Sequence, residues 1–213
     1  LSPLRKRGSS KLDSRLRRTD RTAPLVKAAD RRSAELRGND KGSYKPTVVF
    51  GLTGSIACYK VCDTISDLTT SGVRVQCVLT ESARHFITSL TLASLSGLSV
   101  YEEQFMTPPF SEPLHTRLAR EADLVVIAPA TANIIAKMAA GMADDLLTSV
   151  ILATTAKILI VPAMNENMWN NSFTQENIMK LKQAGMYFVD PIRGHLVCQI
   201  EGVGHIAEAE VIT

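Results

Sequence analysis

The chain has 213 residues, 45% of them hydrophobic, which is enough apolar material for one domain with a sizeable core. No apolar run reaches the roughly 18 residues that a membrane-spanning helix needs, and no secretory leader pattern opens the sequence, so a membrane or secreted protein is not expected. The four cysteines lack the paired spacing of a zinc site and indicate a protein of a reducing, cytoplasmic compartment.

Charge is distributed unevenly along the chain. Residues 1–45 carry 14 Lys and Arg against 5 Asp and Glu, a net charge of +9, whereas residues 46–213 have a net charge of −6. The first segment has few large apolar residues and no sustained periodicity, so we expect a basic, disordered, solvated N-terminal arm. An arm for an anionic partner or a residual targeting segment is the alternative, and nucleic-acid binding is not expected.

From residue 46 onward, apolar strands alternate with helical segments. This alternation predicts a doubly wound, mainly parallel sheet with helices on both faces, the flavodoxin or Rossmann-like class of α/β fold. In chain order, the sequence predicts a strand at Thr47–Leu52, a helix to about Thr70, a strand at Val73–Leu79, short helices at Ser82–Phe86 and Thr91–Leu95, a loop at Glu102–Pro113, a helix at His115–Glu121, a strand at Leu124–Ala128, helices at about 132–141 and Asp144–Thr154, a strand at Ile158–Val161, a helix at Asn170–Ala184 and a strand at Met186–Val189.

Small and polar residues follow four of the predicted strands. Ligands of doubly wound sheets bind beyond the carboxyl ends of the strands, so four segments that converge on one edge predict a ligand site. The segments are Thr53–Ile56, Thr80–Ser82, Pro129–Asn133 and Pro162–Asn165.

The first of these segments lies in residues 51–57, which read GLTGSIA. Gly54 would let a ligand approach the backbone, and the N–H groups at the start of the next helix favour one phosphate. The run is not GxGxxG, so a dinucleotide site is not indicated. A tight turn with Ser55 as the helix N-cap is the alternative.

The third segment belongs to residues 128–133, which read APATAN. Small residues there would let a planar ring lie near the backbone, with Thr131 and Asn133 to hydrogen-bond it, although an ordinary capping turn is the plainer alternative. Farther along, Asp144 and Asp145 are adjacent on a predicted helix and face different directions. We therefore expect them to cap and start that helix rather than to bind a metal.

Three ordered motifs resemble those of the flavin-dependent cysteine decarboxylases. Residues 162–169 (PAMNENMW) are similar to that family's PxMNxxMW signature, and residues 128–147 to its APATANTIAKxAxGxADDLL stretch, with Ile134 in place of a frequent threonine. Residues 197–208 resemble its substrate clamp, ACGxxGxGRMxE, but carry Gln199, His205 and Ile206 where the family has glycine, arginine and methionine. The resemblance covers about residues 47–212.

Within that family, the chain is most similar to the members that convert 4′-phosphopantothenoylcysteine to 4′-phosphopantetheine in coenzyme A biosynthesis. The resemblance implies bound FMN, no metal, and a reaction through a thioaldehyde and an enethiolate. It also implies trimers or multiples of trimers with FMN near the subunit interface, and a synthetase domain that is separate or missing here.

The resemblance also assigns residues to roles. It implies that His115 serves the oxidative decarboxylation and that Cys198 donates the proton of the reduction, while Asn165 binds the substrate carboxylate between Met164 and Met168. Taken singly, each of these residues has an ordinary structural interpretation. The residues expected to bind FMN are Gly54, Ser55, Ile56, Thr80, Ser82, Thr131, Ala132, Asn133, Ile134 and Ala163.

The sequence alone is also compatible with other functions. A peptidyl-cysteine decarboxylase would stop at the enethiol, and Cys198 argues against it because that residue serves the reduction. A non-catalytic relative that regulates a phosphatase fits the charged arm, but intact His115, Asn165 and Cys198 argue against it. A flavin prenyltransferase would share the fold without the Met-Asn-x-x-Met-Trp run.

Overall fold

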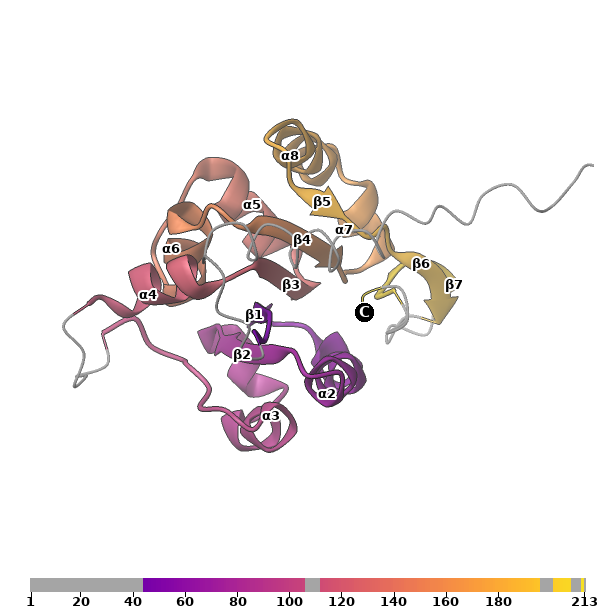
Figure 1. Cartoon of the computed structure of the whole chain (residues 1–213). Helices are drawn as coiled ribbons and strands as arrows, with labels where there is room; N and C mark the ends of the chain where they lie inside the picture. Colours follow the sequence, from indigo (N-terminus) through magenta and orange to yellow (C-terminus); the bar gives the residue numbers. More distant parts are fainter. Residues whose placement is uncertain (1–43, 106–111, 196–200, 208–211, 213) are drawn as a thin grey trace, which may run out of the picture.

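The computed structural model describes residues 44–105, 112–195, 201–207 and 212 (Figure 1). All but the end of the predicted N-terminal arm lies outside these residues, as do Cys198 and part of the predicted loop at Glu102–Pro113. The described residues form a central sheet between two helical layers, together with a separate hairpin.

Five parallel strands form the sheet in the order β2-β1-β3-β4-β5, which confirms the predicted fold class. Residues in β1, β3 and β4 are almost all buried, as expected for a parallel sheet covered on both faces. The strand order reverses between β1 and β3, and flavodoxin-like sheets bind their ligand at this reversal. The strands are β1 Thr47–Leu52, β2 Arg74–Leu79, β3 Leu124–Ala130, β4 Lys157–Pro162 and β5 Tyr187–Phe188.

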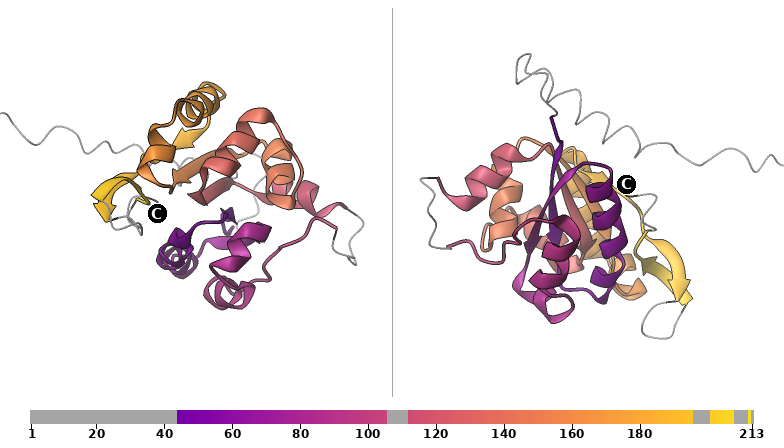
Figure 2. Two further views of the ribbon diagram at one scale, coloured as in Figure 1. Left: turned by 180° about the vertical axis from the view of Figure 1, so that it is seen from behind. Right: turned by 60° about the horizontal axis from the view of Figure 1, so that its bottom comes forward.

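Helices cover both faces of the sheet (Figures 1 and 2). On one face, α2 (Val61–Thr70) and α3 (Ser89–Ser96) pack over a core that includes Phe50 and Leu52 of β1. The other face carries α4 Leu114–Glu121, α5 Ala132–Ala140, α6 Leu146–Ala153 and α8 Ser172–Gln183. None of the described helices has the length and apolar character needed to cross a membrane.

Side-chain caps move several helix boundaries from their predicted positions. The segment after β4 contains an unpredicted short helix, α7 (Glu166–Asn170), before α8. Asn165 caps α7 by accepting from Asn167 N at 2.9 Å, and Asn171 caps α8 by accepting from Phe173 N at 3.0 Å. Asn165 therefore starts a helix that the sequence did not predict, and Asn171 starts the predicted helix two residues later than its expected beginning at Asn170.

The remaining differences lie at the two ends of the domain. The helix predicted after β1 begins as a separate 3-10 helix, Ile56–Tyr59, and Glu81–His85 after β2 is also a 3-10 helix. Near the carboxyl end, β6 (Ile192–His195) and β7 (Glu201–His205) pair as an antiparallel hairpin that projects from the domain (Figure 2). The sequence did not predict the hairpin, because its glycine-rich strands lack an alternating apolar pattern.

The three cysteines among the described residues pack in or against the core. Cys58 and Cys77 are fully buried, and burial raises their thiol pKa to about 11 and about 12 respectively. Cys62 is half-buried against the same core, and burial raises its pKa as well. These thiols remain protonated near neutral pH, as expected for residues with a packing role.

Candidate active site

The loops that follow β1, β2, β3 and β4 enclose a cavity of about 490 Å³ at the carboxyl edge of the sheet. This volume falls within the range of roughly 300–1,000 Å³ typical of small-molecule sites. The cavity lies at the β1/β3 reversal, where the fold class predicts a ligand. Its lining residues are Thr53, Gly54, Ser55, Thr80, Glu81, Ser82, Thr131, Ala132, Asn133, Ile134, Lys137, Asp144, Asp145, Ala163, Met164 and Met168.

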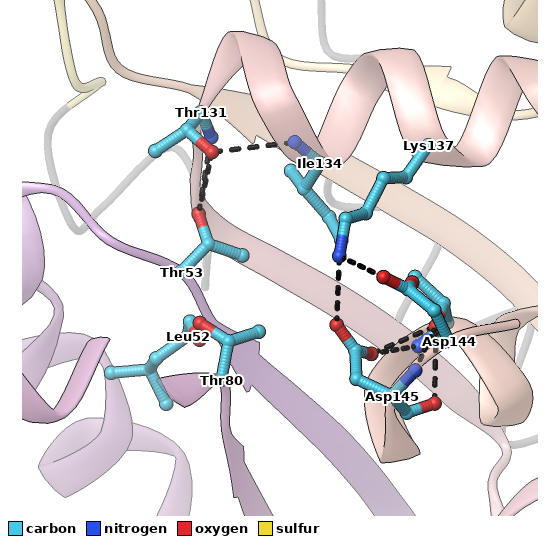
Figure 3. A network of polar contacts seen from close by, with 9 residues as sticks. Leu52, Thr53, Thr80, Thr131, Ile134, Lys137, Asp144 and Asp145 are labelled. Atoms are coloured by element: carbon cyan, nitrogen blue, oxygen red, sulfur yellow. Dashed lines mark hydrogen bonds and ion pairs between the residues drawn. The ribbon is translucent and has the colours of Figure 1, made fainter. Parts of the chain in front are cut away.

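One buried hydroxyl joins the loops on either side of the reversal. Thr53 donates to the carbonyl oxygen of Pro129 at 2.6 Å and accepts from Thr131 N at 3.1 Å. The side chain of Thr131 caps α5 by accepting from Ile134 N, and Figure 3 shows Thr53 directly beneath it. The loop after β1 is thus tied to the start of α5, so the two walls of the cavity hold a fixed spacing.

A close contact between Gly54 and Ser82 sets the spacing of the next two loops. A Cβ atom added at Gly54 would lie 2.5 Å from the Cβ of Ser82, closer than real Cβ contacts allow. Thr80 holds its own loop against β1, because its N–H donates to the carbonyl oxygen of Leu52 at 3.1 Å. Glycine at position 54 is therefore required by the approach of the β2 loop, which itself lines the cavity.

An ion-pair network forms the wall beneath α5 (Figure 3). Lys137 Nζ lies 2.7 Å from Asp144 Oδ2 and 3.5 Å from Asp145 Oδ2. The hydrogen bond between Lys137 and Asp144 raises the pKa of the lysine and lowers the pKa of the carboxyl group. Asp145 also caps α6, with its Oδ1 accepting from Thr148 N at 2.8 Å, so the predicted capping role is confirmed.

Three residues of the segment after β4 are expected to contact the substrate, and two of them line the cavity. Met164 and Met168 line it, whereas Asn165 between them is exposed and caps α7. Met164 N donates to the carbonyl oxygen of Gly204 at 3.1 Å, so β7 is docked directly on this segment. A Cβ at Gly204 would lie 2.1 Å from Met164 O, and its φ of +147° also favours glycine.

Other predicted site residues lie elsewhere or are not described. His115 is half-buried near the start of α4 and does not line the cavity, and Ile56 is 46% exposed in the 3-10 helix beyond Ser55. Cys198 and Gln199 fall outside the described residues. The remaining residues expected to bind the cofactor all line the cavity, although their contacts with a ligand stay a prediction.

Sequence reasoning missed several lining residues because their structural roles were the more obvious ones. Thr53 was included in a strand-end segment but not singled out, and Glu81 sits between two residues that were. Asp144 and Asp145 were interpreted only as helix-start charges, and Lys137 only as part of a motif. A charged triad spaced at 137, 144 and 145 across a glycine turn was the available signal.

Two departures from the family's clamp have structural partners. His205 Nε2 lies 2.8 Å from the Nζ of Lys60, at the start of α2. Ile206 is only 2% exposed and belongs to the core that α2 and α3 cover, so its side chain packs in the interior. Within the described residues, no group of three or more His, Cys, Asp or Glu side chains could hold a metal ion.

Comparisons with known proteins agree with this architecture. The family model described as Flavoprotein matches residues 37–213. The chain is 42% identical over 161 residues to the coenzyme A biosynthesis bifunctional protein CoaBC of Vibrio vulnificus strain YJ016, covering 76% of this chain and 40% of that protein. Its counterpart in Bacillus subtilis strain 168 is 42% identical over 165 residues, covering 78% and 41%. The chain thus spans about two fifths of these curated relatives.

Solved structures are similar over nearly their whole length. A PPC decarboxylase mutant complexed with pantothenoylaminoethenethiol matches with a TM-score of 0.71 and 33% identity, covering 79% of this chain and 94% of that chain. The FMN binding protein AtHal3 matches with a TM-score of 0.68 and 34% identity, covering 79% and 93%. Because its family model matches most of the sequence and these structures share both fold and sequence, the chain belongs to the Flavoprotein family.

Proposed function

We propose that this chain is an FMN-dependent decarboxylase that converts 4′-phosphopantothenoylcysteine to 4′-phosphopantetheine in coenzyme A biosynthesis. The observation that carries the proposal is the assembly of residues 128–137 and 162–168, the two strongest decarboxylase motifs, around one cavity at the β1/β3 reversal. The similarity to coenzyme A biosynthesis proteins and to PPC decarboxylase favours this substrate over a peptidyl cysteine or a regulatory role. The proposal covers decarboxylation alone, because the matched region is about 40% of each bifunctional relative.

The residues of the cavity suit FMN. The small side chains of Ala132 and Ala163 leave room for a flat ring, and Thr131 and Asn133 supply neutral hydrogen-bonding groups. Gly54 lets the loops after β1 and β2 approach each other closely, and beside it the backbone and hydroxyl of Ser55 are suited to the phosphate. Ile134 contributes apolar surface on the same wall.

The difficulty of the reaction is that cysteine has no group to accept the electrons that remain when its carboxylate leaves. FMN held in this cavity would supply this chemistry, as acceptor of a hydride from the cysteine Cβ in the oxidation and as hydride donor in the later reduction. With the thiol proton also lost, the substrate becomes a thioaldehyde, which accepts the electron pair of the breaking Cα–carboxylate bond and gives an enethiolate. The enethiolate then needs a two-electron reduction and one proton to become the product.

Side chains of this protein orient the substrate and move its protons. The Asn165 Oδ1 is held by Asn167 N–H, so the side-chain NH₂ is the donor that a carboxylate would meet. A neutral amide orients that carboxylate without the ion pair that would stabilise it against loss of CO₂. Met164 and Met168 pack against the pantothenoyl arm, His115 serves the oxidative decarboxylation, and Cys198 donates the final proton.

We propose a homo-oligomer, either a trimer or a multiple of trimers, as the active form. His115 does not line the cavity of its own chain, so a second copy would be needed to bring this residue to the flavin. Two exposed apolar side chains offer surface for such an interface: Met168, which lines the cavity and is 48% exposed, and Ile56, which follows the lining residue Ser55 and is 46% exposed. A cytoplasmic location is proposed too, since the described cysteines are free thiols.

Mass spectrometry of the products tests the proposed reaction. The FMN-loaded protein is expected to convert 4′-phosphopantothenoylcysteine to 4′-phosphopantetheine with release of CO₂. The Cys198→Ser variant is expected to decarboxylate the substrate but to release an enethiol or its oxidation product. The matched variant Cys62→Ser is expected to behave like the parent. Bound FMN without any loss of CO₂ would rule out this substrate.

A further inference from the structure

Lys60 and His205 form a polar pair between segments that are 145 residues apart. The Nζ of Lys60 lies 2.8 Å from the Nε2 of His205, and the Nδ1 of His205 lies 3.0 Å from the carbonyl oxygen of Ile206. An ammonium group only donates and a carbonyl only accepts, so Nε2 accepts the Lys60 proton and Nδ1 carries the ring's hydrogen. In this arrangement the Nε2 atom of His205 accepts from the ammonium group of Lys60 and orients it.

Neither Lys60 nor His205 lines the cavity, but the segment of each is connected to a lining residue. Lys60 follows the 3-10 helix that begins directly after Ser55, a lining residue. His205 follows Gly204, whose carbonyl oxygen accepts from the N–H of Met164, another lining residue, at 3.1 Å. The pair thus joins the wall formed by the β1 loop to the wall formed by the segment after β4.

Charge distinguishes Lys60 from the lysine that lines the cavity. Lys137 is held by two carboxylates, whereas no salt bridge joins Lys60 to a carboxylate of the described residues. One proton of its ammonium group is used by His205, and two donors remain. A positive charge that is held in place, with no carboxylate paired to it among the described residues, is suited to a strongly anionic group such as a phosphate monoester.

We infer that the Lys60–His205 pair is a phosphate-monoester contact at the edge of the cavity. Both ligands of the proposed function carry such a group, FMN on its ribityl chain and the substrate at its 4′ position, so the inference rests on the proposed function for its two sources.

Binding measurements with and without each phosphate test the inference. For the cofactor phosphate, FMN and riboflavin are titrated into the apoprotein, and binding is followed by flavin fluorescence. For the substrate, 4′-phosphopantothenate and pantothenate, which carry no cysteine to react, are titrated into the FMN-loaded protein by calorimetry. Lys60→Met is expected to lower the affinity for one of the two phosphorylated ligands by about tenfold, as for loss of one charge-assisted hydrogen bond. The affinity for the matching ligand without the phosphate is expected to stay unchanged.

Three further variants separate a phosphate contact from a general loss of charge or of folding. Lys180→Met, on the exposed surface of α8, removes one lysine charge away from the cavity and is expected to match the parent. His205→Leu removes the acceptor and is expected to reproduce part of the Lys60→Met effect, whereas His205→Gln keeps an acceptor and is expected to retain binding. The thermal midpoint of each variant is compared with that of the parent.

Each outcome decides the inference. A selective loss for FMN assigns the contact to the cofactor, and a selective loss for 4′-phosphopantothenate assigns it to the substrate. Equal weakening of phosphorylated and dephosphorylated ligands, or no change in either pair, overturns the inference. If the parent binds these ligands but does not decarboxylate 4′-phosphopantothenoylcysteine, the proposed function fails while the phosphate contact is still judged by the binding ratios.

Discussion

At the residue scale, the spacing of the cavity walls depends on a single hydroxyl group. Thr53 is 2% exposed, and its hydroxyl satisfies both Pro129 O and Thr131 N. Thr53→Val keeps the volume but leaves these two groups without that partner, so we expect the free energy of unfolding to fall by about 1–3 kcal/mol. FMN affinity is expected to fall as well, because the two loops no longer hold each other. Urea unfolding and flavin titration measure both effects.

Thr53→Ser provides the control at the same position. It retains the hydroxyl and loses only a methyl group, so its free energy of unfolding should stay within about 1.5 kcal/mol of the parent and its FMN affinity should be preserved. If Thr53→Val binds FMN as tightly as the parent, the bridge between the loops does not position the cofactor.

At the element scale, the connection between α5 and α6 depends on charge. The Lys137–Asp144 contact lowers the pKa of Asp144 from an ordinary value of 3.8 and raises that of Lys137 from 10.5. Asp144 therefore contributes stability above pH 3.8 that is lost as the pH falls through its lowered folded-state pKa. Lys137 contributes stability below pH 10.5 that is lost as the pH rises through its raised folded-state value.

Lys137→Met is expected to cost at most about 1 kcal/mol at pH 7, because both side chains are partly exposed and solvent screens the pair. The difference from the parent should stay constant from pH 7 to about pH 4 and shrink as the pH falls further, through the lowered pKa of Asp144. Urea unfolding across this range measures it, with Lys180→Met as the surface control. A deficit that stays constant over the whole range would mean that lost packing of the lysine stem, not the ion pair, is responsible.

At the scale of the whole molecule, the carboxyl end of the chain completes the first core. Ile206 is 2% exposed and packs in the same cluster as Phe50 of β1 and Leu92 of α3. Ile206→Ala is expected to lower the free energy of unfolding by about 2–5 kcal/mol. Ile206→Met restores the family's residue with a similar volume and should cost less than about 1.5 kcal/mol. Denaturant unfolding compares the two, and a small effect of Ile206→Ala would show that the carboxyl end is not part of the cooperative core.

Several features could be predicted from the sequence because they depend on local chemistry. The alternation of apolar strands with helices predicted the parallel sheet, and β1 was predicted residue for residue as Thr47–Leu52. Polar and small residues after four strands predicted the edge at which the cavity lies, since parallel strands all end on one side. Asp144 and Asp145 were predicted together to cap and start a helix, and Asp145 is the residue that caps it.

Other features were decided only by the tertiary structure, because they join residues that are distant in the sequence. The Thr53 bridge to the α5 loop, the approach of Gly54 to Ser82 and the Lys60–His205 pair have no local signal, since each partner on its own is an ordinary turn or surface residue. The same applies to His115, whose position away from the cavity no spacing rule revealed. The sequence by itself determined the fold class, the edge of the sheet and the residue types of the site, whereas the folded chain decided which of those side chains meet.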